Sequence, residues 1–181
     1  MKIKFEYHET YYEIASNAYR KTKELTKKRD SIQGKVELSD DDAAMIADIN
    51  EEISKNAITV IIFSAFLLEA YINDYAIRRI SKGYLEKYLD KLNLLSKWIV
   101  IPRVVTGKQL DTGSEAIQDL SWLISQRNKL AHYKSETVGV EEITESHFVW
   151  EYDAERAIHT VSKLINNLSE IDSRIERSWL K

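Results

Sequence analysis

Apolar residues recur with the 3.6-residue period of an α-helix along most of this 181-residue chain. Only five glycines and one proline interrupt the pattern, which is typical of long continuous helices. We therefore predict an all-α fold, an up-and-down helical bundle of about five or six helices. The length fits one domain over 1–181, with an N-terminal helix and linker at 1–38 and the core at 39–181. The predicted helices cover 7–30, 39 to about 82, 84–95, about 114–134 and 152–180.

Turn and capping residues set the expected boundaries. Gly34 ends the first helical pattern, and Ser39 followed by three aspartates begins the second, where acidic residues favour the helix N-terminus. Ser114 or Thr112 is expected to cap the helix at 114–134. Pro102 disfavours helix at the residue before it, so the chain is expected to turn near position 101. Residues 136–151 are acidic and β-branched, which predicts a loop or a short hairpin.

The stretch from Ala57 to Ile72 is apolar nearly all round and is a potential membrane span. It covers about sixteen residues and contains Glu69, whereas a span needs about eighteen or more. A buried central helix without a membrane is the better interpretation.

Composition narrows the function classes. The chain has no cysteine, which excludes disulfides and thiolate zinc sites, and the first ten residues show no signal peptide. We predict a cytoplasmic protein.

The net charge of −3 argues against broad electrostatic coating of nucleic acid. Charge is nevertheless uneven, because residues 20–29 hold six basic residues and one glutamate, while 136–155 hold seven acidic residues and no Lys or Arg. Both charged runs are also typical of solvent-exposed helix and loop surface.

The segment from Arg127 to His132 conflicts with the helical pattern around it. Arg127 falls at the centre of an apolar arc about 140° wide on the helix at 114–134. A guanidinium there needs an anion, a carboxylate partner or a wet cleft, because it does not lose its proton. Asn128 and His132, one turn apart, lie just beyond the edge of the arc. The arc contains Ala116, Ile117, Leu120, Leu123, Ile124, Leu130 and Ala131.

Glu69 is a second charge on an apolar helix, and Asn73 lies one turn further along the same face. One hypothesis is that Glu69, with Asn73, orients Arg127 or its neighbourhood. The alternative is that Glu69 belongs to an ordinary structural ion pair.

Asn128 directly follows Arg127, and four residues lie between Arg127 and His132. This arrangement, on about the fourth helix of a small helical domain, resembles the Rx4-6H motif of the HEPN superfamily. The apolar helix at 63–73 and the segment 97–102 before the motif helix support the likeness, which covers roughly 55–170. In the toxins of this superfamily that pair with nucleotidyltransferase antitoxins, a tyrosine two places after the His is modified. Here that place is Lys134, and Tyr133 directly follows His132, so regulation by tyrosine modification is not carried over.

The resemblance implies a homodimer whose two motif helices face one cleft, commonly with metal-independent endoribonuclease activity. It implies that Arg127 and His132 are the catalytic pair and that Asn128 supports them. A role as a toxin or in defence, with an antitoxin or regulatory protein as partner, would be in keeping with the family.

The residues themselves also favour RNA cleavage through the 2′-hydroxyl over metal chemistry. The four histidines form no HxH or HExxH pattern, so neither a metal site nor a cofactor is predicted. His132 would act as general acid or base and Arg127 would hold the phosphate, and a two-fold dimer supplies the second His132. Tyr133 could stack a base, and Lys129 and Lys134 could touch phosphates, while DNA should be inert. The two lysines are equally well explained as ordinary solvated side chains near a helix C-terminus, where the helix dipole favours cations.

Two alternatives of other classes stay open. One is a non-catalytic, HEPN-like dimeric domain that binds RNA, a nucleotide or a partner protein at the same cleft. The other is a helical scaffold in which Arg127 pairs with Glu69 and no anion enters.

Overall fold

The computed structural model describes residues 7–133 and 149–180, and within these ranges the regular structure is entirely helical. The predicted all-α class and number of helices are confirmed for the described residues. The helices are α1 (Tyr7–Gln33), α2 (Asp40–Arg79), α3 (Lys82–Tyr84), α4 (Leu94–Thr106), α5 (Glu115–Ala131) and α6 (Glu151–Ile171), with a π-helical turn, η1 (Leu85–Leu89).

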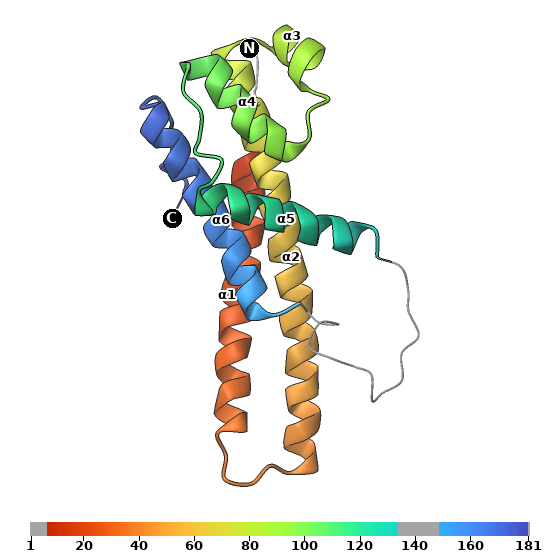
Figure 1. The fold of residues 1–181 in the computed structure, drawn as a ribbon. Helices are drawn as coiled ribbons and strands as arrows, with labels where there is room; N and C mark the ends of the chain where they lie inside the picture. The colour runs from red at the N-terminus through yellow and green to blue at the C-terminus, as the bar shows by residue number, and fades with distance from the viewer. Residues whose placement is uncertain (1–6, 134–148, 181) are drawn as a thin grey trace, which may run out of the picture.

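Helices α1 and α2 form a long antiparallel pair, and α6 packs along the upper half of both (Figure 1). Helix α5 lies across α2 rather than beside it, which departs from a simple up-and-down arrangement (Figure 1). Ala15 and Ala18 of α1 are buried in the same cluster as residues of α2, α4, α5 and α6, so α1 is part of the core. The far end of the α1–α2 pair has its own small cluster of Ile32, Ile49 and Ile53.

The start of α2 follows from its capping residues. Ser39 Oγ accepts a hydrogen bond from the Asp42 backbone N–H at 3.1 Å, and the Asp42 carboxylate accepts one from the Ser39 N–H at 3.2 Å. This reciprocal capping box satisfies two N–H groups that the helix itself leaves without partners. The predicted boundary at Ser39 is confirmed.

The middle of α2 is long and apolar enough to cross a membrane by length and composition, over an 18-residue window of which 44% is buried inside the bundle. Ile53, Leu67, Leu68 and Ile72 within α2 are fully buried against neighbouring helices. The packing supports a central helix of the bundle.

Helix α4 continues through Pro102, so the predicted turn near position 101 is wrong. Proline removes one helical hydrogen bond and costs about 3 kcal/mol in a helix interior. Trp98 and Ile101 are completely buried, and each contributes a comparable amount through burial. The indole Nε1 of Trp98 also donates to the Leu68 carbonyl at 3.2 Å. Tertiary burial therefore outweighs the local preference, and α4 ends at Gly107, whose φ of 74° favours glycine.

Two further boundaries differ from the prediction. The helix expected over 84–95 is broken, because η1 ends at Leu89 and Asn93 caps α4 through a bond from the Ser96 N–H at 2.8 Å. The helix expected over 152–180 ends at Ile171, and the chain then turns back over the bundle. Most of the predicted loop or hairpin at 136–151 lies outside the described residues.

Candidate functional site

Helix α5 carries the predicted site residues, and its N-terminal half fixes it to the bundle. Ser114 occupies the N-cap position, although its hydroxyl donates to the Asp111 carbonyl at 2.6 Å rather than capping the helix. Leu120 and Leu123 are fully buried. Arg127 follows Leu123 by one turn and so lies on the same side of α5.

Arg127 is partly buried, and its Nε is fully buried with no hydrogen-bond partner. Within the described residues its guanidinium forms no ion pair. A buried N–H that loses water without gaining a partner costs about 1–3 kcal/mol, and more when the group is charged. The expected demand of Arg127 for an anion is therefore not met by the described part of the protomer.

Glu69 does not meet this demand. Its Oε1 lies 3.8 Å from the Nζ of Lys97 on α4, whose side chain is only 3% exposed, whereas that of Glu69 is 42% exposed. The hypothesis that Glu69 pairs with Arg127 is wrong, and the structural ion pair is the correct alternative. Helix α4 packs against this part of α2, so the carboxylate reaches Lys97. Asn73, one turn further, has a buried Oδ1 with no hydrogen-bond partner.

The end of α5 is open to solvent. Asn128, Lys129, His132 and Tyr133 are all exposed, and His132 closes the helix through its backbone N–H, which donates to the Asn128 carbonyl at 3.0 Å. Lys134 lies outside the described residues.

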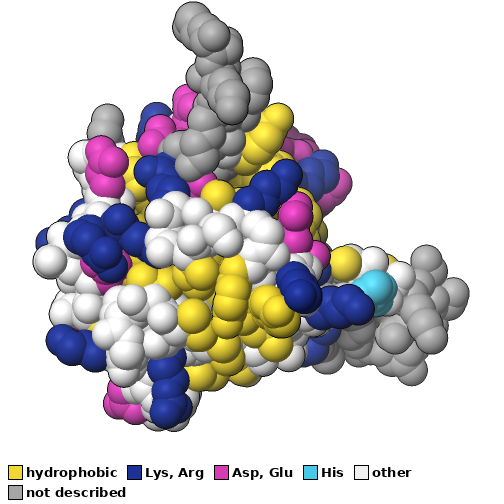
Figure 2. Space-filling model, turned by 90° about the horizontal axis from the view of Figure 1, so that it is seen from above, with side chains coloured by type: hydrophobic (Ala, Val, Ile, Leu, Met, Phe, Trp, Pro, Cys, Tyr) yellow, Lys and Arg dark blue, Asp and Glu magenta, His cyan; other side chains and the backbone are white. Residues whose placement is uncertain are grey.

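The predicted apolar arc is buried only over the first half of α5. Leu130 is partly buried and Ala131 is exposed, because α5 runs on past α2 into solvent (Figure 1). Seen from above, this end forms an arm that carries a histidine beside Lys or Arg side chains, next to a face where hydrophobic side chains gather (Figure 2). The exposed end is therefore accessible to a substrate or to a second copy of the chain.

Arg127 and His132 differ in exposure, because Arg127 is partly buried and His132 is exposed at the end of α5. Four residues lie between them, which corresponds to about 140° around the axis of an ideal helix, although His132 itself is the C-cap after the last helical residue, Ala131. Asn128 and His132, four residues apart, share one side.

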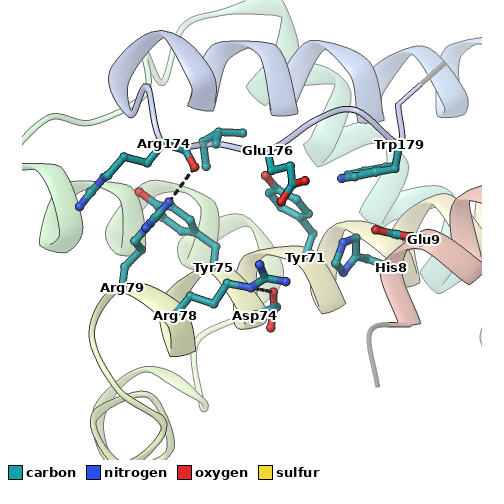
Figure 3. A pocket seen from close by; sticks show the side chains of 11 residues that line it. His8, Glu9, Tyr71, Asp74, Tyr75, Arg78, Arg79, Arg174, Glu176 and Trp179 are labelled. Carbon is teal, nitrogen blue, oxygen red and sulfur yellow. Dashed lines mark hydrogen bonds and ion pairs between the residues drawn. The ribbon is translucent and has the colours of Figure 1, made fainter. Parts of the chain in front are cut away.

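A separate cavity of about 130 Å³ lies where the ends of α1 and α2 meet the segment after α6. Figure 3 shows His8, Tyr71 and Trp179 at one side and three arginines, Arg78, Arg79 and Arg174, at the other. Sequence reasoning missed this cavity because it assigned 152–180 to one helix, which would have carried these C-terminal residues away from α2.

Much of the charge around this cavity is internally paired. Arg174 donates two hydrogen bonds to Asp172, at 2.7 and 2.9 Å, and Tyr75 Oη donates to the same carboxylate at 2.9 Å. The bonds from Arg174 hold the pKa of Asp172 well below its usual range, although burial opposes the shift. Arg79 donates to the Arg174 carbonyl at 2.8 Å. These contacts fasten the C-terminal segment to α2, which is a structural role.

Within 7–133 and 149–180, no three His, Asp or Glu side chains cluster in a way that would hold a metal ion. Comparisons of the chain with protein-family models, curated proteins and solved structures found no match. The resemblance to HEPN domains therefore rests on the motif and its helical context.

Proposed function

We propose that this protein is a metal-independent endoribonuclease of the HEPN type that acts as a homodimer. The observation that carries the proposal is the guanidinium of Arg127, which is held against the bundle with a buried Nε and no carboxylate partner in the described residues. Of the three guanidinium nitrogens only Nε is both buried and without a partner, so a phosphate from outside would bind the terminal Nη groups, with charge-assisted hydrogen bonds. Asn128 and His132 on the open end of α5 supply the other groups that the reaction requires.

The proposed reaction forms a bond between the ribose 2′-oxygen and phosphorus and breaks the bond from phosphorus to the 5′-oxygen. One His132 takes the proton of the 2′-hydroxyl, and the partner subunit's His132 gives a proton to the leaving 5′-oxygen. Arg127 stabilises the charge that develops on the phosphate, and Asn128 orients the phosphate or the imidazole. The products are a 2′,3′-cyclic phosphate and a 5′-hydroxyl.

The second candidate function is a non-catalytic HEPN-like domain that binds RNA, a nucleotide or a partner protein at the same place. The difference in exposure between Arg127 and His132 favours it, because the partly buried guanidinium can bind an anion without any contribution from the exposed imidazole.

Cleavage of RNA in EDTA separates the two candidates. The wild type is expected to cleave, and Arg127→Ala and His132→Ala are each expected to lower the rate by about 10²-fold or more. Ser125→Ala, an exposed change on the same helix, is the matched control and should keep full activity. Gel filtration should give a dimer. A wild type that leaves RNA intact at every protein concentration, or alanine variants that cleave normally, would remove the nuclease proposal.

A further inference from the structure

A second surface, far along the chain from the α5 motif, has the composition of a single-stranded RNA site. It is a groove of about 960 Å³ between α1 and α6, bordered at one end by Trp179. The basic run at 20–29, which the α5 motif does not use, begins inside this groove with Arg20 and Lys23.

Aromatic rings follow the groove. Trp179 and Tyr12 meet edge to face with ring centroids 5.4 Å apart, and Tyr19 and His159 meet in the same way at 6.5 Å. Tyr12 and Tyr19 are two helical turns apart, a rise of about 10 Å along α1. His159 is exposed, and the other three rings are partly exposed. Unpaired bases stack on such rings without sequence preference.

Among the described residues, neither Arg20 nor Lys23 of the groove has a carboxylate partner. Arg20 donates to the neutral Asn17 side chain at 2.9 Å, and Lys23 lies 5.5 Å from the centre of the Tyr19 ring. Lys21, on another face of α1, is instead 3.7 Å from Glu24. This part of the groove therefore presents two cations without an ion-pair partner in the described residues, beside an aromatic pair and one carboxylate, Glu155, which accepts a hydrogen bond from the Tyr19 hydroxyl. The two cations and the rings complement a phosphate backbone with stacked bases.

The opposite end of the groove is acidic, since Glu9 and Glu13 line it. These carboxylates repel phosphates and confine the complementary part of the groove to the half around Tyr19, Arg20, Lys23 and His159. A patch of this extent holds a few nucleotides.

We infer that the basic, aromatic half of the α1–α6 groove binds single-stranded RNA at a place distinct from the cleavage residues of α5. The inference deepens the proposed function and rests on it, because it gives the nuclease a second contact for its substrate. RNA held there would remain attached while the scissile phosphate meets Arg127.

The test measures the affinity of the full chain for a short fluorescein-labelled oligouridylate with 2′-O-methyl riboses, which lacks the hydroxyl needed for cleavage. Arg20→Glu with Lys23→Glu is expected to weaken binding about tenfold and to reduce the salt dependence, log Kd against log salt, by about 1.4 for two lost phosphate contacts. The matched control is Lys21→Glu with Lys28→Glu, which changes the charge equally about 120° around α1 and should alter affinity less than about twofold.

A second pair of variants tests stacking at Tyr19, whose hydroxyl donates to Glu155 at 3.1 Å. Tyr19→Phe keeps the ring and should bind almost as well as wild type, whereas Tyr19→Leu should bind about fivefold more weakly or worse. Circular dichroism checks that each variant folds.

The two proposals fail separately. Affinity that is unchanged by the groove variants, or reduced equally by the control pair, overturns the groove as an RNA site, whatever the cleavage assay shows. Groove-dependent binding by a protein that never cleaves RNA supports this site and overturns the nuclease. Capture of a partner helix in the groove, with RNA affinity unchanged by the variants, also overturns it.

Discussion

The two halves of α5 differ in whether their charged side chains have ion-pair partners. In the first half, the buried Asp119 accepts hydrogen bonds from Arg156 and Lys163 of α6, both at 2.8 Å. In the second half, Arg127 faces the bundle with no such partner among the described residues. Helix α5 therefore contains one charge that has ion-pair partners and one that has none among the described residues. The comparison teaches that burial alone does not distinguish the two charges, and that the presence or absence of a partner does.

The largest expected difference between the halves is in hydrophobic packing. Leu123→Ala should lower the free energy of unfolding by about 3 kcal/mol, because Leu123 is fully buried and the substitution leaves a cavity. Leu130→Ala should lower it by only about 1 kcal/mol, because Leu130 is partly buried. Urea denaturation measures both. Equal losses would show that the end of α5 is packed as firmly as its start.

Asp119→Asn should lower the free energy of unfolding by about 1.5 kcal/mol at neutral pH, because the substitution removes the charge from a side chain that is only 5% exposed. The effect is no larger because the partner side chains, Arg156 and Lys163, are 45% and 36% exposed, so that water screens both ion pairs. Burial raises the pKa of Asp119, but the hydrogen bonds from Lys163 and Arg156 outweigh it and lower the pKa overall. A lowered folded-state pKa contributes stability above the unfolded value, near 4, that disappears as the pH falls through the folded value. The difference between wild type and variant should therefore be constant above about pH 5 and vanish in acid.

Denaturation series at several pH values check this prediction. Glu115→Gln is the control, because Glu115 also contacts Lys163 but its side chain is 76% exposed, so it should have a much smaller effect. A difference between wild type and Asp119→Asn that persists in acid would contradict an ionic role for Asp119.

The smallest expected effect on stability is that of Arg127→Met. The substitution keeps an unbranched apolar stem and removes a charged group with an unsatisfied N–H, so the free energy of unfolding should stay within about 0.5 kcal/mol of wild type or rise. Thermal and urea unfolding measure it. A loss above about 1 kcal/mol would mean that Arg127 has a stabilising partner and would remove the contrast between the two halves of α5.

Helical periodicity and capping residues predicted the long elements well, because α1 and α2 are amphipathic or apolar over many turns and begin or end at Ser39 and Gly34. Local rules failed where tertiary contacts outweigh them. Pro102 stays helical because Trp98 and Ile101 are buried around it. Helix α6 ends at Ile171, because the carboxylate of the following Asp172 accepts hydrogen bonds from Arg174 and Tyr75, which hold the chain in a turn.

The motif positions on α5 could be placed from the sequence, but their partners could not. Helical phase put Arg127 on the inner side of α5, and it is partly buried there. Which carboxylate lies opposite depends on how α4, α5 and α2 cross, and no pattern in one chain reveals that Glu69 faces Lys97. Asp119 lies at the edge of the apolar arc and looks like a surface residue until α6 covers it.

The far end of the α1–α2 pair extends below the start of α6 (Figure 1). Between its two helices lies a small cluster of three buried isoleucines, with the partly buried Leu25 and Ile46 packed against them. Two helices with so little shared apolar surface separate at much lower free energy than the bundle above them. Backbone amides between about 34 and 48 should therefore exchange with deuterium through local opening, long before those of Leu67 or Leu164. A protease that cleaves near Gly34 would then nick the folded protein at this tip and leave the bundle, with both halves of α5, assembled.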